Sequence, residues 1–174
     1  MRAIGFRASP LEVTYAVLET PTADPDSYSV IGTGKIPIPA ALWIPEQLHF
    51  IRTVLLDVID EMSVRRAGIR LTEMVALNRS TFRNNVEGVL QEMLAASSVE
   101  HYVAGGNAAL SAHMELTDKK LFKQYCEGEK TPPFAKNWGS LSVAVREASL
   151  AAIAALKSTP NSVVSVPPAT AAAP

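Results

Sequence analysis

Short apolar runs that alternate with polar residues open the chain. Residues 2–7 and 12–19 form two such runs, and Pro10 lies in the turn signal between them. Apolar and polar side chains alternate along the second run, which is typical of a strand with one exposed face. A polar stretch with two prolines follows, and strand character returns over residues 28–38. We therefore predict three consecutive antiparallel strands.

The spacing of apolar residues then changes to the helical period. A helix begins after Pro45, a favourable first-turn residue, and its apolar face continues through Met62. Beyond it the pattern predicts a strand, a second amphipathic helix and another short strand, at residues 66–75, 81–96 and 100–104. Helices therefore alternate with strands in the middle of the chain.

The last third of the chain predicts helices and no further strands. Residues 108–114 are expected to form one or two helical turns, and residues 117–127 a helix with Thr117 as its N-cap. An alanine-rich helix follows at residues 140–157, and its small side chains would let it lie close against a sheet. Residues 158–174 are rich in Ala, Pro, Ser and Val without periodicity, which predicts a flexible tail.

This order of elements indicates the fold class. Three antiparallel strands that lead into alternating helices and strands predict an α/β protein with a mixed sheet and helices on its faces. A length of 174 residues suits one domain. We therefore expect a single domain over residues 1–157, followed by the tail.

Composition and charge exclude some classes of function. Lys and Arg total 16 against 17 Asp and Glu, a formal net charge of −1, so nucleic-acid binding would require a local basic patch. The single Cys126 excludes an internal disulfide and a cysteine-rich zinc site. No apolar stretch is long enough to cross a bilayer, and the first residues lack the apolar core of a signal peptide. We expect a cytoplasmic protein without a membrane partner.

Three segments carry a family resemblance: AIGFRASPLEVTYAVLE, RAGIRLTEMVALNRSTFRNNVEGVLQEML and NWGSLSVAVREASLAAIAALK. They resemble the first hairpin, the fourth strand with its following loop and helix, and the final helix of the ribonuclease-H-like superfamily, especially its RuvC-like (Holliday-junction-resolvase-like) branch. The resemblance covers most of residues 1–157. A similar pattern occurs in small bacterial proteins of this superfamily, so the resemblance implies a ribonuclease-H-like sheet in a bacterial protein.

The resemblance also implies where catalytic carboxylates would lie. Active members cleave or transfer nucleic-acid strands with two divalent cations, which clustered carboxylates hold. The corresponding positions here are Arg7 in the first strand, Arg70 or Glu73 in the fourth, and Arg146 or Glu147 in the last helix. A guanidinium group cannot coordinate a cation and would repel one. The resemblance therefore implies a degenerate site without a metal.

Three interpretations of these arginines remain open. In the first, Arg7 and Arg70 are strand-end residues that pair with Glu12, Glu73 or Glu147. In the second, they line the former active-site cleft and grip a phosphate group. In the third, the chain is an active nuclease that uses the same glutamates in a shifted arrangement with Mg²⁺ or Mn²⁺.

Residues 78–85 add candidate phosphate-binding groups. This segment places Arg79, Ser80 and Arg83 at the start of a predicted helix, where free backbone N–H groups and the helix dipole favour an anion. The alternative is simple capping of the helix by Ser80 or Thr81, with solvated arginines.

Two tryptophans lie in predicted loops. Trp43 and Trp138 are flanked by proline or glycine residues. Exposed, they would suit base stacking or a protein partner. Because aromatic residues make up only 6% of the chain, we expect both to be packed in the interior.

The leading hypothesis is a catalytically degenerate ribonuclease-H-like domain that acts as a binding or assembly module without a cofactor. Its partner would be nucleic acid, bound through a basic cleft, or a protein within a bacterial complex. One alternative is an active metal-dependent nuclease, with Glu73 and Glu147 as its candidate catalytic residues. Another is a purely structural subunit. An exposed sheet edge and the apolar fraction also allow a homo-oligomer.

Overall fold

A five-stranded mixed sheet forms the centre of the molecule. The computed structural model describes residues 1–21, 27–73, 80–118, 120–133, 135 and 137–159. Its strands are β1 (Arg2–Ala8), β2 (Glu12–Glu19), β3 (Ser29–Pro37), β4 (Arg66–Arg70) and β5 (His101–Gly105), in the order β3-β2-β1-β4-β5. The pairs β1–β2 and β2–β3 are antiparallel, whereas β1–β4 and β4–β5 are parallel. The predicted mixed sheet is confirmed.

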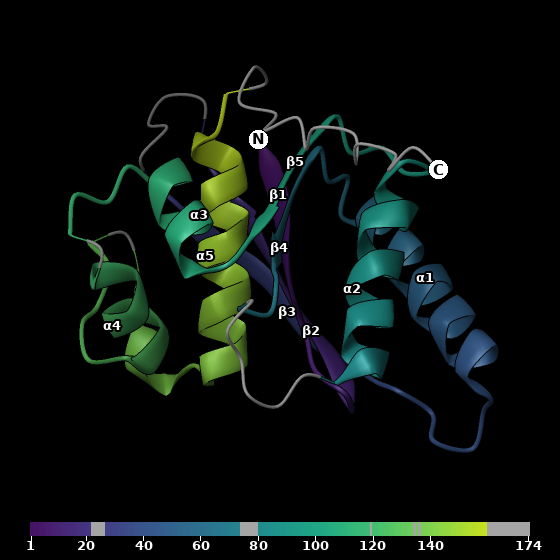
Figure 1. The fold of residues 1–174 in the computed structure, drawn as a ribbon. Helices are drawn as coiled ribbons and strands as arrows, with labels where there is room; N and C mark the ends of the chain where they lie inside the picture. Colours follow the sequence, from purple (N-terminus) through teal and green to yellow (C-terminus); the bar gives the residue numbers. More distant parts are fainter. Residues whose placement is uncertain (22–26, 74–79, 119, 134, 136, 160–174) are drawn as a thin grey trace, which may run out of the picture.

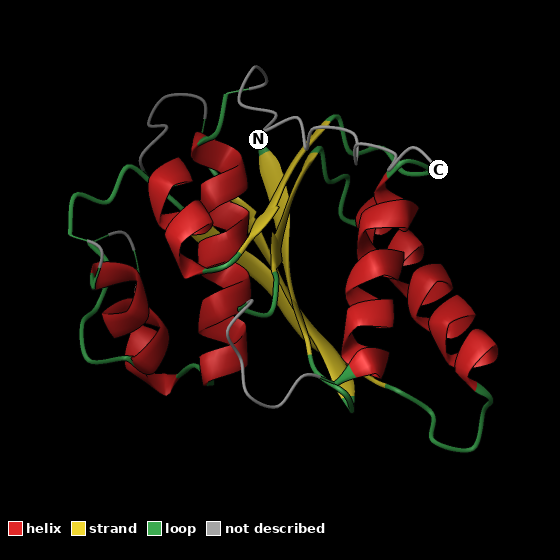
Figure 2. Ribbon diagram, in the orientation of Figure 1, coloured by secondary structure: helices red, strands yellow, loops and turns green. Residues whose placement is uncertain are grey.

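Helices cover both faces of this sheet (Figures 1 and 2). One face carries α1 (Ile44–Glu61) and α2 (Thr81–Leu94), and the other carries α3 (Asn107–His113), α4 (Leu121–Glu127) and α5 (Val143–Lys157). Most boundaries agree with the sequence prediction to within two residues. The α/β fold class follows from this arrangement.

The strand predicted over residues 66–75 is shorter than expected. β4 ends at Arg70, because only one further backbone bond, from Leu71 N to Gly105 O, extends its pairing with β5. The next amide, of Thr72, bonds the side chain of Glu87 in α2. Residues 74 and 75 lie outside the described residues.

Two helices begin later than the sequence predicts. Thr117 is not an N-cap: α4 begins at Leu121, and Lys120 is its N-cap. The carboxylate of Asp118 accepts the Lys120 amide at 2.8 Å just before the helix begins. α5 begins at Val143, since Trp138–Ser140 form a separate 3-10 turn and Ser142 caps the helix.

α5 lies directly on the backbone of the neighbouring strands β1 and β4. A Cβ atom at Gly5 would overlap the carbonyl oxygen of Ala148, and one at Gly68 would overlap that of Ala151. Glycine is therefore needed at both strand positions for this contact. The predicted close packing of the alanine-rich helix is confirmed.

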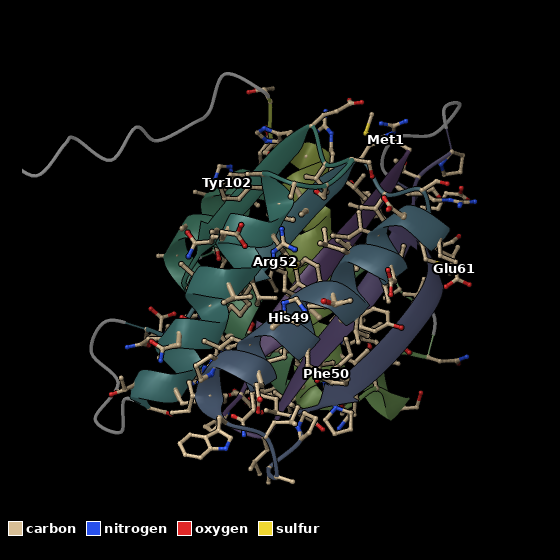
Figure 3. The ribbon with its side chains drawn as sticks, turned by 90° about the vertical axis from the view of Figure 1, so that its right-hand side faces the viewer. Met1, His49, Phe50, Arg52, Glu61 and Tyr102 are labelled. Carbon is tan, nitrogen blue, oxygen red and sulfur yellow. The ribbon has the colours of Figure 1, made fainter. Side chains whose placement is uncertain are left out.

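The opposite face buries the apolar stripes of α1 and α2, which Figure 3 shows from the outside. The fully buried side chains of this layer are Ile4, Phe6, Val13, Val17, Ile51, Leu55, Ile59, Val64, Ala67, Ile69, Val86, Leu90 and Met93. At the surface, Arg52 of α1 pairs with Glu92 of α2 at 3.0 Å. These contacts fix the two helices against each other and against the sheet.

The two tryptophans differ in burial. Trp138 is 2% exposed, as expected, and its Nε1 donates to the Tyr125 carbonyl at 2.8 Å. Trp43 is 80% exposed, so the expectation that it packs in the interior is wrong. It is the N-cap of α1, a position at the helix end that projects away from the core.

Two further expectations concern membranes and the tail. Within the described residues, no helix has the length and apolar character that a bilayer span requires. α5 ends at Lys157, and residues 160–174 lie outside the described residues, so the flexible tail stays a prediction.

Candidate functional site

The parallel pairing of β1 and β4 brings two arginines together. Arg7 lies opposite Arg70 in the register, and Gly105 of β5 lies opposite Arg70. These residues stand at the carboxyl ends of their strands. The amino-terminal ends of α1, α2 and α5 lie at the same end of the molecule (Figure 1). Side chains from several segments can therefore meet there.

A single carboxylate from α5 bridges these arginines. Glu147 Oε2 lies 2.5 Å from Arg7 Nε, and Glu147 Oε1 lies 3.6 Å from Arg70 Nε. The exposed fractions of the three side chains are 18% for Arg7, 13% for Glu147 and 5% for Arg70. Each carboxylate oxygen therefore faces a different, mostly buried guanidinium group.

Glu73 joins the same network from the other side of Arg70. Its Oε1 lies 3.2 Å from Arg70 Nη2 and accepts the amide of Asn107, the first residue of α3, at 2.7 Å. A Cβ at Gly106 would lie 2.6 Å from Glu73 Oε2, so a residue without a side chain leaves room for this carboxylate. Two arginines and two glutamates thus form one charge-balanced cluster.

The pKa values of two buried groups follow from this environment. Burial lowers the pKa of Arg70, and the nearby charge of Arg7 lowers it further, while Glu147 and Glu73 oppose the shift. Burial raises the pKa of the Cys126 thiol to about 12, and Glu147 adds to the increase. Cys126 is a buried free cysteine, and its thiol is neutral at physiological pH.

A second cluster fixes the start of α2. Ser80 Oγ accepts the amide of Arg83 at 3.3 Å, which confirms Ser80 as the N-cap. The buried Glu87 Oε1 accepts Arg83 Nε at 3.2 Å, Thr72 N at 2.9 Å and Thr72 Oγ1 at 2.7 Å. Arg83 is therefore paired and not solvated. Arg79 lies outside the described residues.

Glu87 is a residue that the sequence analysis missed. Its spacing of four residues from Arg83 on a predicted helix was the available signal, because such pairs face each other on a helix surface. The spacing did not indicate that Glu87 would be buried or that Thr72 would reach it. Both depend on where the chain turns after β4.

Glu12 does not join the cluster. It pairs with Lys35 of β3 at 2.9 Å, so the structure does not support its proposed pairing with Arg7 or its place in a shifted catalytic set. Glu73 and Glu147 are brought together, but both lie against Arg70. Within the described ranges, no group of three or more His, Cys, Asp or Glu residues could hold a metal ion. The residues present do not fit a two-metal centre.

Comparisons with known proteins give the fold. No model of a protein family matches the chain, and no curated protein matches it significantly. Among solved structures, it is similar to Thermus thermophilus RuvC, with a TM-score of 0.61 and 13% identity over 88% of this chain and 92% of that one. The same protein in complex with a Holliday junction substrate gives a TM-score of 0.59 and 11% identity, with the same coverage. The chain has a ribonuclease-H-like fold.

This ribonuclease-H-like fold confirms the fold class expected from the sequence. At these identities the likeness establishes the architecture alone, so function has to be argued from the side chains. The cluster of Arg7, Arg70, Glu73 and Glu147 and the start of α2 are the parts of the fold that carry such an argument.

Proposed function

We propose that this chain is a catalytically inactive ribonuclease-H-like domain that binds nucleic acid at the end of the sheet where Arg7 and Arg70 lie. The observation that carries the proposal is the pairing of Glu147 with both arginines. The positions that would have to supply metal ligands instead hold the guanidinium groups of Arg7 and Arg70, which neutralise the carboxylate of Glu147.

The chemistry of a two-metal site requires free carboxylate oxygens close to each cation. Here the oxygens of Glu147 each face a guanidinium group, and Glu73 is bound to Arg70 and to the Asn107 amide. A divalent cation would have to displace these partners and also approach the two buried positive charges. We infer that metal-dependent strand cleavage is lost.

Nucleic-acid binding is supported by groups that suit a phosphate backbone. Arg7 and Arg83 supply partly exposed guanidinium N–H donors whose direction their carboxylate partners fix, and the buried Arg70 adds positive charge behind Arg7. Ser80 and Arg83 stand at the amino-terminal end of α2, where phosphate contacts are favoured. The RuvC neighbour has been solved with a Holliday junction substrate, which makes branched DNA the first ligand to try.

The test is binding of labelled single-stranded, duplex and branched DNA and of an RNA–DNA hybrid, measured by gel shift at rising salt. We expect binding to weaken with salt, because phosphate contacts release counterions. Arg83→Gln is expected to weaken binding several-fold. Arg65→Gln is the matched control, since Arg65 pairs with Glu100 on the surface beyond the other end of β4.

Either of two results would overturn the binding proposal: no shift with any nucleic acid, or equal loss in Arg83→Gln and Arg65→Gln. The first result would favour the structural-subunit alternative, in which Arg7→Ala changes stability and no binding. A protein partner and a homo-oligomer would then be the interactions to test next.

One observation favours the nuclease alternative. Glu73 and Glu147 converge on the same guanidinium group, so both carboxylates would face one point if the Arg70 side chain moved away. An active enzyme with this displaced pair would cleave nucleic acid only with Mg²⁺ or Mn²⁺ present, which separates it from a binding module.

A further inference from the structure

Arg146, the residue before Glu147 in α5, is a buried charge without a partner. It is 7% exposed, and its side chain makes no hydrogen bond or ion pair with any other residue in the described part of the chain. Its Nε is sealed from solvent and has no acceptor. A buried, unpaired cation is strongly unfavourable, so such a group is unusual in a stable fold.

The turn after α4 is shaped around this guanidinium group. Gly128 ends α4 in the left-handed conformation, with φ +78°. A Cβ at Gly128 would overlap Arg146 Nη1 and would crowd Cζ as well. Glycine is therefore required there twice, for the backbone conformation and for the space that Arg146 fills.

Capping of α4 does not account for Arg146. The carbonyl groups of Gln124 and Tyr125 in the last turn of α4 already have backbone donors: Gly128 N bonds Tyr125 O, and Glu129 N bonds Gln124 O. The nearby Glu127 pairs with Lys123 at 3.6 Å. An arginine at a helix end commonly bonds free carbonyls, but the side chain of Arg146 donates to no carbonyl group within the described residues.

The charges around Arg146 leave an excess of positive charge. The buried thiol of Cys126 responds to the charges of Glu147, Arg70, Arg7 and Arg146, so all four surround one part of the interior. Arg7 and Arg70 share Glu147, and Arg70 also has Glu73. Arg146 is the arginine of this group that lacks a carboxylate.

We propose that Arg146 anchors a phosphate-binding site at the turn formed by Gly128. The planar guanidinium group can donate in parallel to two oxygens of a phosphate group. Arg7 and Arg70 add a favourable field, and the neutral thiol of Cys126 does not oppose it. The phosphate group comes either from a free phosphate or phosphomonoester, or from a nucleic-acid backbone.

The first experiment compares thermal unfolding of the full chain in sodium phosphate and in sodium chloride at equal ionic strength. Phosphate is expected to raise the Tm by about 2–4 °C once its concentration is several times the Kd, and the effect should saturate. Arg146→Gln removes this difference, whereas the surface control Arg65→Gln keeps it. Broadening of the phosphate ³¹P signal by the wild-type chain, and not by Arg146→Gln, reports the binding directly.

The proposal is overturned by equal Tm values in the two salts together with an unbroadened ³¹P signal, or by a phosphate effect that survives undiminished in Arg146→Gln. If Arg146→Gln does not fold, Arg146→Lys decides, because it keeps the charge and loses the planar fork. We expect Arg146→Lys to retain less than half of the phosphate-dependent rise in Tm.

DNA binding by the wild-type chain and by Arg146→Gln distinguishes the two sources of the phosphate group. If the backbone supplies it, Arg146→Gln weakens DNA binding, and inorganic phosphate displaces labelled DNA. If a free phosphate or phosphomonoester supplies it, DNA binding is unchanged in Arg146→Gln while the phosphate effect on Tm is lost. Both results support the site. If the chain binds no nucleic acid, the phosphate-dependent Tm and the ³¹P signal still test whether the site exists.

Discussion

At the scale of single side chains, Glu147 holds the guanidinium groups of Arg7 and Arg70 in place. Its neutralisation in Glu147→Gln would leave Arg7 and the buried Arg70 without their shared carboxylate. We expect this substitution to lower the free energy of unfolding by about 2–4 kcal/mol, because an uncompensated buried charge is costly. Urea or guanidinium unfolding followed by circular dichroism gives the value.

Glu100→Gln is the control for this prediction. Glu100 pairs with Arg65 at 3.4 Å on the surface, and both side chains are mostly exposed. Such a pair contributes about 0–1 kcal/mol. Equal losses in Glu147→Gln and Glu100→Gln would show that the cluster is not a buried ion-pair network.

Cys126 gives a prediction about pH. The pKa of its thiol is about 12 in the folded chain against 9.0 for the unperturbed group. The unfolded chain therefore loses this proton at lower pH, so the contribution of the neutral thiol to stability is complete below about pH 9 and is lost as pH rises toward 12. Between about pH 8 and pH 10.5, the wild-type chain should lose about 2 kcal/mol more than Cys126→Ala.

The comparison with Cys126→Ala isolates the thiol. Burial also raises the pKa of Tyr125, and that effect acts in the same direction. It is present in both chains and cancels in the difference. If the free energies of unfolding of the wild-type chain and of Cys126→Ala changed equally over this pH range, the result would contradict the buried position of the thiol.

The sequence predicted part of this residue-scale arrangement. The resemblance placed Arg7 and Arg70 at strand ends, and the pairing interpretation included Glu147. Charge and spacing did not select Glu147 over Glu12, because the choice depends on how α5 lies on the sheet. They also gave no sign that Arg146 would be buried, since that depends on the turn formed by Gly128.

At the scale of elements, the contact between α5 and the central strands is the one most sensitive to added atoms. A Cβ at Gly68 would overlap the Ala151 carbonyl, and α5 cannot move away without opening the core. We expect Gly68→Ala to lower the free energy of unfolding by about 3 kcal/mol or more, or to prevent folding. Chemical unfolding measures the lower free energy of unfolding, and the far-ultraviolet circular dichroism spectrum shows whether the variant folds.

Gly88→Ala is the matched substitution in α2. A Cβ at Gly88 would meet open space, so alanine there should raise the free energy of unfolding by about 0.5–1 kcal/mol through its higher helix propensity. A tolerated Gly68→Ala would mean that α5 does not lie against β4 as closely as the structure shows.

Glu87 connects α2 to the chain beyond β4. Its carboxylate accepts the amide and hydroxyl of Thr72 and the guanidinium group of Arg83. We expect Glu87→Gln to cost about 1–3 kcal/mol and to speed hydrogen exchange at the Thr72 amide and at the first turn of α2. Glu92→Gln, on the exposed side of α2, should leave exchange at these amides unchanged.

Element boundaries were predictable where local signals set them. Pro45 and Ser80 mark helix starts through fixed backbone geometry and capping, and the structure places helices there. The start of α5 was predicted three residues too early, because the separate turn before Ser142 was not expected. The end of β4 was not predictable, because Thr72 leaves the sheet to bond Glu87, a partner from a distant segment. Side-chain bonds of this kind override the local strand pattern.

At the scale of the whole molecule, the pattern of hydrophobic residues was sufficient for the architecture. Three alternating runs followed by alternating helices and strands permit few arrangements, and the ribonuclease-H-like sheet is one of them. The chemistry was less predictable. It depends on the parallel register of β1 and β4, which sets Arg7 beside Arg70, and on a single carboxylate that crosses from α5.

The loss of metal-dependent cleavage is the central claim and can be measured directly. The purified full chain would be incubated at low salt with labelled single-stranded, duplex and branched DNA and an RNA–DNA hybrid, each with and without Mg²⁺ or Mn²⁺. The account predicts intact substrates under every condition, because both oxygens of Glu147 face arginines. Metal-dependent cleavage that disappears in a Glu73→Gln, Glu147→Gln double variant would contradict it and make this chain a nuclease.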